Sequence, residues 1–271
     1  MKKEDKMKTV LTIAGSDCSG GAGIQADIKT LTVHGVYAMS CITALTAQNT
    51  LGITGIMPVP EDFFRKQLES IFTDIRPDVV KTGMICSAEQ AEWIVEYVKK
   101  YGVEQLVVDP VMISSSGTSL MKQKDRKKIW ESLFSQASVL TPNIPEAEIL
   151  SQRKITSKYQ REEAAREIGN RWKCAVFCKG GHDREEADDL LFDEKSEQKM
   201  TWFRAKRIDN PNTHGTGCTL SSAIAANLAL GFSIEDSVQK AKAYVNQAIR
   251  AGLDLGKGNG PLNHMGKESE K

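Results

Sequence analysis

The stretch VLTIAGSDCSGGAGIQADIKTL, from Val10 to Leu31, sets the expected fold. Residues 10–14 form an apolar, β-branched run that is typical of a buried strand. A turn with glycines at 15, 20, 21 and 23 follows, and Ile24, Ile28 and Leu31 then recur at helical spacing. A strand, a glycine-rich turn and a helix in this order predict the first half of a βαβ unit.

The same alternation of β-branched runs and helical patterns continues along the chain. Ser87 with Gln90 has the spacing of a capping box before one helix, and Ser233 with Asp236 begins another. Connections of this kind predict an α/β fold with a mostly parallel sheet, helices on both faces, and ligands beyond the carboxyl ends of the strands. Further strands are predicted at residues 37–44, 79–80, 106–108, 139–140 and 175–179.

Length and charge favour one domain that acts on a small molecule. The chain has 271 residues and a formal net charge of +1, so no basic field points to nucleic acid. No linker-like composition interrupts it, and residues 9–265 are expected to form a single domain between a flexible tail at 1–8 and a second tail at 266–271. The most polar stretch, 183–199, is predicted to be an exposed hairpin or flap.

Location and metal content follow from the N-terminus, the cysteines and the histidines. The apolar run after residue 8 is too short for a signal peptide or a membrane span, so a cytoplasmic protein without a membrane partner is expected. The six cysteines form no CxxC pair and are expected to be free thiols, with Cys174 and Cys178 in the core. The four histidines lie far apart and match no zinc pattern.

A second glycine-rich turn, NTHGTGCT at 212–219, runs into the apolar helix pattern of 220–226. The first amides of a helix lack internal partners, so Gly215, Thr216 and Gly217 are expected to form an anion hole for a phosphate. Cys218 lies in the same field and is expected to ionise more easily than a free thiol and to accept a proton from a hydroxyl. The alternative interpretation is a glycine-rich loop followed by a buried cysteine.

Neither of the common nucleotide-binding motifs is present. After Gly15 the spacing to Gly20 fits GxxxxG, but position 21 is glycine where a P-loop needs lysine. The early glycines also do not give the regular GxGxxG of a dinucleotide site. They are better interpreted as shaping a substrate pocket.

Several segments in a fixed order carry a family resemblance over residues 9–265. They resemble the hydroxymethylpyrimidine and phosphomethylpyrimidine kinases of thiamin biosynthesis, a vitamin-kinase branch of the ribokinase superfamily. The resemblance implies a ribokinase-like three-layer αβα sandwich with ATP as co-substrate and Mg²⁺ as metal. The segments are TIAGSDCSGGAGIQAD (12–27), KTGM (81–84), VDPVM (108–112), LTPNIPEAE (140–148) and GKGNGPLNH (256–264).

The resemblance also implies which residues bind the substrate. Gln48 matches the family's pyrimidine-recognising glutamine, whose amide donates and accepts as an aminopyrimidine requires. Asp27 matches the position that holds the substrate's polar edge, although a lone helical aspartate is more often a solvated side chain. Gly15, Met84 and Val111 are expected to shape the pocket and supply its apolar walls.

On the nucleotide side, Asn143 and Glu146 resemble the superfamily's Asn-x-x-Glu motif for magnesium and phosphate. Asp109 at a strand end is a second candidate metal ligand, and its alternative role is to cap the turn before Pro110. Lys179 is assigned to the ATP phosphates, although a lone strand-end lysine is usually only a solvated charge.

The function that we predict is phosphorylation of 4-amino-5-hydroxymethyl-2-methylpyrimidine, and then of its monophosphate to the diphosphate, with Cys218 as base. Most sugar kinases of the superfamily have aspartate at this position, whereas the vitamin-kinase branch has cysteine. Two alternatives stay open: a pyridoxine or pyridoxal kinase, against which Gln48 argues, and a non-catalytic pyrimidine-binding regulator. By analogy with such families, the chain is expected to form a homodimer.

Overall fold

The computed structural model describes residues 6–112, 123–181 and 187–266. Six strands run parallel in the middle of the sheet: β1 (Thr9–Asp17), β2 (Tyr37–Asn49), β4 (Val79–Thr82), β5 (Gln105–Val108), β6 (Val139–Leu140) and β7 (Ala175–Cys178). Three antiparallel strands extend the edges: β3 (Gly52–Pro58), β8 (Asp189–Phe192) and β9 (Met200–Phe203). The nine-stranded order is β3-β2-β1-β4-β5-β6-β7-β8-β9.

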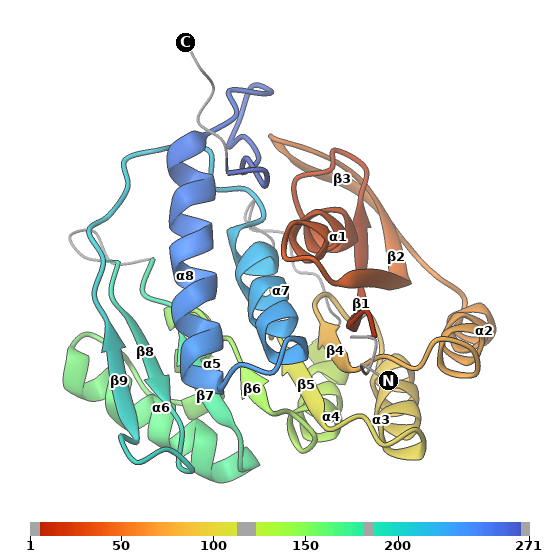
Figure 1. Ribbon diagram of the computed structural model, residues 1–271, viewed down its shortest axis with the longest axis horizontal. Helices are drawn as coiled ribbons and strands as arrows, with labels where there is room; N and C mark the ends of the chain where they lie inside the picture. The colour runs from red at the N-terminus through yellow and green to blue at the C-terminus, as the bar shows by residue number, and fades with distance from the viewer. Residues whose placement is uncertain (1–5, 113–122, 182–186, 267–271) are drawn as a thin grey trace, which may run out of the picture.

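Helices cover both faces of this sheet and complete a three-layer αβα sandwich (Figure 1). One face carries α1 (Gly23–Val33), α7 (Thr216–Ala229) and α8 (Ile234–Ala251). The other carries α2 (Glu61–Phe72), α3 (Ala88–Lys100), α4 (Gln123–Phe134), α5 (Ile144–Ser151) and α6 (Lys158–Trp172). The predicted α/β class and mostly parallel sheet are therefore confirmed.

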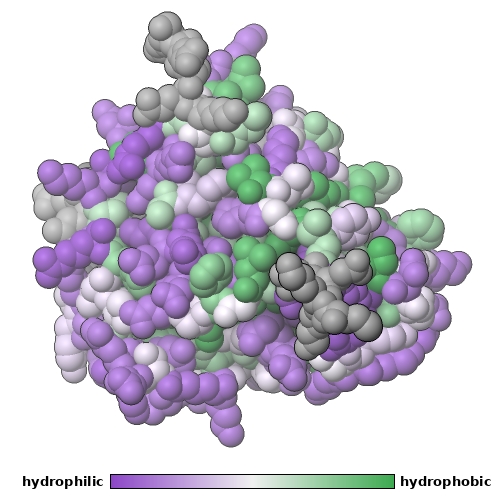
Figure 2. Space-filling model, viewed as in Figure 1, coloured by the Kyte–Doolittle hydropathy of each residue, from purple (hydrophilic) through white to green (hydrophobic). Residues whose placement is uncertain are grey.

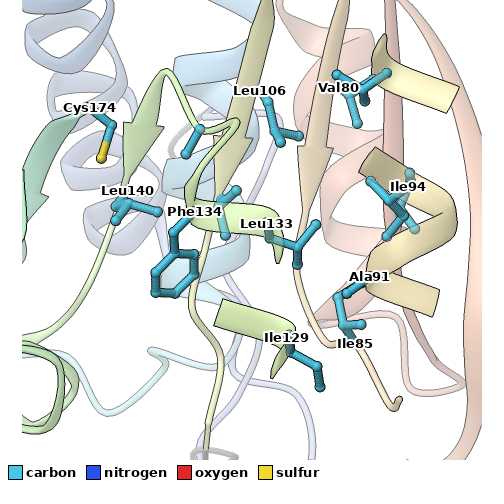
Figure 3. Close-up of a cluster of buried hydrophobic side chains, with 14 of the residues drawn as sticks. Val80, Ile85, Ala91, Ile94, Leu106, Ile129, Leu133, Phe134, Leu140 and Cys174 are labelled. Atoms are coloured by element: carbon cyan, nitrogen blue, oxygen red, sulfur yellow. The ribbon is translucent and has the colours of Figure 1, made fainter. Parts of the chain in front are cut away.

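The central strands are apolar throughout because both faces of the sheet pack against a hydrophobic core. Val80 of β4 and Leu106 of β5 belong to the core under α3 and α4, whereas their neighbours Val79 and Val107 belong to the core under α7 and α8. Figure 3 shows the first core, where side chains of α3 and α4 meet those of the strands. At the surface, the face of the molecule in Figure 2 is mostly hydrophilic, with hydrophobic residues in small separate groups.

Two local predictions need correction. The stretch 183–199 was expected to be exposed, but its described part contains β8, which is buried because it pairs with β7 on one side and β9 on the other. The Ser87 hydroxyl caps α3 as predicted, by accepting from the Gln90 amide at 3.1 Å. The Gln90 side chain, however, accepts from the Cys86 amide and not from that of Ser87, so the capping box is incomplete.

Several predictions about the chain as a whole can also be compared with the structure. Cys174 and Cys178 lie in the core as predicted, and they are free thiols, as are Cys18, Cys41 and Cys218. Within the described ranges, no helix combines the length and the apolar composition that a membrane span requires. Most of the two predicted tails, residues 1–5 and 267–271, lies outside the described residues.

Candidate active site

The carboxyl ends of the parallel strands gather most of the predicted site residues. β1 carries Gly15 near its end and leads into the turn at 18–22, β4 leads to Met84, β5 leads to Asp109, and β7 leads to Lys179. Helix α7 points its N-terminus at this edge, and its loop touches the turn after β1: a Cβ on Gly215 would stand 1.9 Å from the Gly21 carbonyl oxygen. Segments about 200 residues apart are thus brought into one site.

The N-terminus of α7 has the geometry that an anion site needs. Gly215 is its N-cap with φ +84°, a conformation that a side chain at this position would strain and the Gly21 contact would forbid. The Thr216 amide donates to the Thr213 carbonyl at 3.3 Å, within the turn. The amides of Gly217 and Cys218 lie in the first turn, where a helix supplies no partner, and they are the main groups for the predicted anion hole.

An ion pair between the half-buried Lys179 and the buried Asp109 lies directly beside this helix end. Lys179 Nζ donates to Asp109 Oδ1 at 2.8 Å, and the Thr141 hydroxyl donates to the same oxygen at 3.0 Å. A Cβ on Gly217 would stand 3.4 Å from Asp109 Oδ2 and 3.5 Å from Lys179 Nζ. A carboxylate, an ammonium group and the predicted anion hole therefore share one small volume.

Asn143 and Glu146 are engaged in a complete capping box at the start of α5. Asn143 Oδ1 accepts from the Glu146 amide at 2.9 Å, and Glu146 Oε2 accepts from the Asn143 amide at 2.8 Å. Burial raises the pKa of Glu146 to about 7; Lys179 opposes this rise and the Asp109 carboxylate adds to it. A hard cation bound between the two carboxyl groups would favour the ionised form of Glu146, so Asp109 and Glu146 make a suitable pair of oxygen donors.

Cys218 lies half-buried in the first turn of α7, but its acidity differs from the prediction. Burial raises the pKa of its thiol to about 11; Lys81 lowers that pKa, while Asp27 and Asp109 raise it. The predicted easier ionisation of this thiol is therefore wrong for the ligand-free protein, because desolvation outweighs the favourable charge of Lys81. The thiol is protonated at neutral pH.

Asp27 does not face the pocket, which contradicts its predicted contact with the substrate. Its side chain is fully buried, and Lys81 Nζ donates to both carboxylate oxygens at 2.8 Å. The hydroxyls of Thr12 and Ser222 donate to the same carboxylate at 2.6 and 2.7 Å, so its acceptor positions are filled. This cluster joins β1, α1, β4 and α7 beneath Cys218, and Asp27 holds Lys81 in place.

Gly15, Met84 and Val111 come together as one apolar wall. A Cβ on Gly15 would touch Met84 Sδ at 3.0 Å, so the absence of a side chain lets the methionine pack against the turn. Met84 and Ala44 form a small buried cluster against which Val111 and Cys86 pack. The three predicted pocket residues are thus neighbours, and Ala44 and Cys86 are additions that the sequence did not indicate.

Gln48 is the next-to-last residue of β2. Its Nε2 is 3.3 Å from His214 Nε2, and the same histidine nitrogen is 2.9 Å from Asp17 Oδ2. A cavity of about 220 Å³ opens here, lined by Gln48, His214, the β2–β3 turn at 49–52, and Gly258 with Asn259. Polar groups at the wall of a cavity of this size suit a small heterocycle.

The sequence predicted no role for three residues that lie in the site: Asp17, Lys81 and His214. Two of them have a local signal. Lys81 interrupts an apolar strand pattern, where a charge needs a buried partner, and His214 directly precedes the N-cap glycine of α7. Their partners lie far away in the sequence, so the contacts themselves could not be predicted.

Comparisons with known proteins agree with this arrangement. A family model described as phosphomethylpyrimidine kinase matches residues 17–263. The chain is 42% identical over 257 residues to the hydroxymethylpyrimidine/phosphomethylpyrimidine kinase of Bacillus subtilis, covering 94% of both chains. It is 46% identical over 258 residues to the thiamine biosynthesis bifunctional protein of Geobacter sulfurreducens, and it spans about half (52%) of that longer relative and 95% of itself.

The solved structures that this chain resembles are also kinases. The phosphomethylpyrimidine kinase of Clostridium difficile has 43% identity and a TM-score of 0.79, with 89% of this chain and 99% of that chain covered. The pyridoxal kinase of Staphylococcus aureus, solved with AMP-PCP and pyridoxal, has 33% identity and a TM-score of 0.87, covering 98% of this chain and 96% of that chain. On the match over nearly its whole length, the chain belongs to the phosphomethylpyrimidine kinase family.

Proposed function

We propose that this protein transfers the γ-phosphoryl group of ATP to the hydroxymethyl group of 4-amino-5-hydroxymethyl-2-methylpyrimidine, and a second phosphoryl group to the resulting monophosphate. One observation carries the proposal. The helix turn that bears Cys218 also bears the predicted anion hole, and it lies beside the Lys179–Asp109 pair. A base, amide donors and a cation are thus available to one migrating phosphoryl group.

In this mechanism Cys218 accepts the hydroxyl proton while the alkoxide oxygen forms its bond to the γ-phosphorus and the bond to the ADP oxygen breaks. The amides of Gly217 and Cys218, together with Lys179, stabilise the charge on the transferred group. Since burial raises the pKa of Cys218 to about 11, only a small fraction is thiolate at neutral pH, and that fraction is a strong base. The fully buried Lys81 is the cation that favours this thiolate.

The same region fits a magnesium ion. Asp109 and Glu146 would hold it, and Asn143 at the start of α5 lies where a phosphate of ATP is expected. A magnesium ion held by these two carboxylates would take its other oxygen ligands from ATP and water. Among the described residues, no group of three or more His, Cys, Asp or Glu side chains is placed to hold a metal ion. When bound, such an ion would add positive charge close to the phosphoryl group that is transferred.

A second candidate activity is phosphorylation of pyridoxine or pyridoxal. The similarity to the Staphylococcus aureus pyridoxal kinase favours it. Gln48 at the cavity wall favours the aminopyrimidine, because its amide can pair with adjacent ring donors and acceptors. The Lys179–Asp109 pair beside an anion-binding helix end argues for a kinase over a non-catalytic regulator.

A side-by-side assay of ATP consumption with the two vitamins separates these activities. Gln48→Met should lower the efficiency ratio of aminopyrimidine to pyridoxine by roughly 5- to 100-fold, since each unpaired polar group costs about 1–3 kcal/mol. An unchanged ratio would remove Gln48 as the selector and favour the pyridoxine activity. We further propose that residues 9–265 act as one kinase domain, as a homodimer, and in the cytoplasm, where cysteine thiols stay reduced.

A further inference from the structure

The amide of Gln48 lies between two polar groups that each need a particular partner. His214 Nε2 lies 3.3 Å from the amide atom placed as Nε2, and the Thr46 hydroxyl lies 3.1 Å from the one placed as Oε1. The oxygen and nitrogen of an amide have nearly the same shape, so their assignment follows from the hydrogen bonds they make. Both neighbours indicate the same assignment.

His214 needs an acceptor at Gln48. Asp17 Oδ2 lies 2.9 Å from His214 Nε2, and a carboxylate only accepts hydrogen bonds. Despite burial, hydrogen bonds from His214, Ser19 and Ala22 lower the pKa of Asp17 to about 2, so it is ionised at neutral pH. Nε2 therefore carries the proton, has no lone pair to receive an N–H from Gln48, and can share that proton only with an amide oxygen.

Thr46 needs a donor at Gln48. Its hydroxyl has a single hydrogen, and the shorter of its two contacts is with the Ser16 carbonyl at 2.9 Å. A carbonyl oxygen only accepts, so the hydrogen goes to Ser16 and the Thr46 oxygen is left as an acceptor towards Gln48. The amide nitrogen of Gln48 satisfies it.

We propose that Asp17, acting through His214, and Thr46 together fix the Gln48 amide with Oε1 towards His214 and Nε2 towards Thr46, and that this fixed orientation selects the substrate ring. The proposal rests on the proposed function, in which Gln48 reads the edge of the pyrimidine. Asp17, His214 and Thr46 are positioning residues: they act on the substrate through Gln48.

A fixed amide distinguishes two rings of the same shape. The 4-amino ring offers a donor at position 4 and an acceptor at N3, whereas the 4-oxo analogue offers an acceptor at position 4 and a donor at N3. One orientation of Gln48 pairs with both groups of one ring and opposes both groups of the other. Without His214 as donor, only the Thr46 contact holds the orientation. The amide then turns over more easily, and the enzyme discriminates less between the two rings.

The test compares His214→Met with His214→Gln. Both side chains have the same length, but only glutamine can place an N–H where His214 Nε2 lies, so it donates to Asp17 and to Gln48. For each variant and for Gln48→Met, kcat and KM are measured with the 4-amino ring and its 4-oxo analogue. His214→Met should lower the amino-to-oxo ratio of kcat/KM by about tenfold or more, mostly through KM, and His214→Gln should keep most of the wild-type ratio.

A wild-type ratio in His214→Met, or equal losses in both His214 variants, overturns the proposal while leaving the kinase function intact. Absence of turnover of the aminopyrimidine by the wild type contradicts the proposed function. Nitrogen NMR of the ligand-free protein with isotope-labelled histidine shows which ring nitrogen of His214 carries the proton. This measurement tests the positioning of Gln48 independently of activity. The proposal requires that Nε2 of His214 carries the proton at neutral pH, and an unprotonated Nε2 overturns it.

Discussion

Replacing Lys81 by methionine leaves the Asp27 carboxylate buried without its counter-charge. Both side chains are fully buried and the two carboxylate oxygens each lie 2.8 Å from Lys81 Nζ. Methionine has a similar length and no charge. The hydroxyls of Thr12 and Ser222 remain as donors, but they cannot neutralise a carboxylate in an apolar interior.

The expected loss is about 3–5 kcal/mol in the free energy of unfolding, the range for a buried pair that loses one partner. The assay is equilibrium unfolding in urea, followed by tryptophan fluorescence. Lys66→Met is the matched control: Lys66 pairs with Asp62 at 3.9 Å on the surface, where both side chains are more than two-thirds exposed, so the same substitution should cost less than about 0.5 kcal/mol.

Adding Asp27→Asn to Lys81→Met should restore at least about 1 kcal/mol, because the uncompensated charge is then removed. A Lys81→Met protein as stable as the Lys66→Met control would refute the reasoning. So would a double variant whose loss equals the sum of the two single losses, because the two charges would then be independent.

Two further predictions concern the anion hole and the metal. Gly215→Ala should lower turnover by about 10²-fold or more, since its Cβ would displace the loop from the Gly21 carbonyl, whereas Gly231→Ala, with φ +90° but nothing within 4 Å, should keep its turnover in the same assay. The pKa of Glu146 is about 7, so protons should compete with Mg²⁺ and initial rates should need more Mg²⁺ at pH 6 than at pH 8. Glu146→Gln should need more Mg²⁺ at both pH values and lose that difference; a variant with the wild-type pH dependence would contradict the assignment.

The order of strands and helices could be predicted because the central strands are buried on both faces. Val79-Val80 and Leu106 to Val108 are apolar at every position, and the helices between them have regular apolar spacing. The position of β8 could not be predicted in this way. Its Leu190 to Phe192 is a short apolar run inside a polar stretch, and only its place between β7 and β9 makes it core.

The site was predicted best where one local motif supplies the geometry. Gly215 as the N-cap of α7 follows from its own sequence. The acidity of Cys218 and the role of Asp27 do not, because both depend on groups from other elements. Lys81 is 54 residues from Asp27 in the sequence and Ser222 is 195 residues away, so the contacts that fill the Asp27 carboxylate arise only in the folded protein.

The central claim is that Cys218 removes the proton from the substrate hydroxyl, and a pH–rate profile with ATP and 4-amino-5-hydroxymethyl-2-methylpyrimidine tests it directly. With a thiol pKa of about 11, the thiolate fraction and the wild-type rate should rise by up to roughly tenfold per pH unit between about pH 7 and 9. Cys218→Asp should give a flatter profile, and Cys218→Ala should lose about 10²–10⁴-fold in rate. A Cys218→Ala protein that turns over near the wild-type rate, with the same pH dependence, would contradict the account.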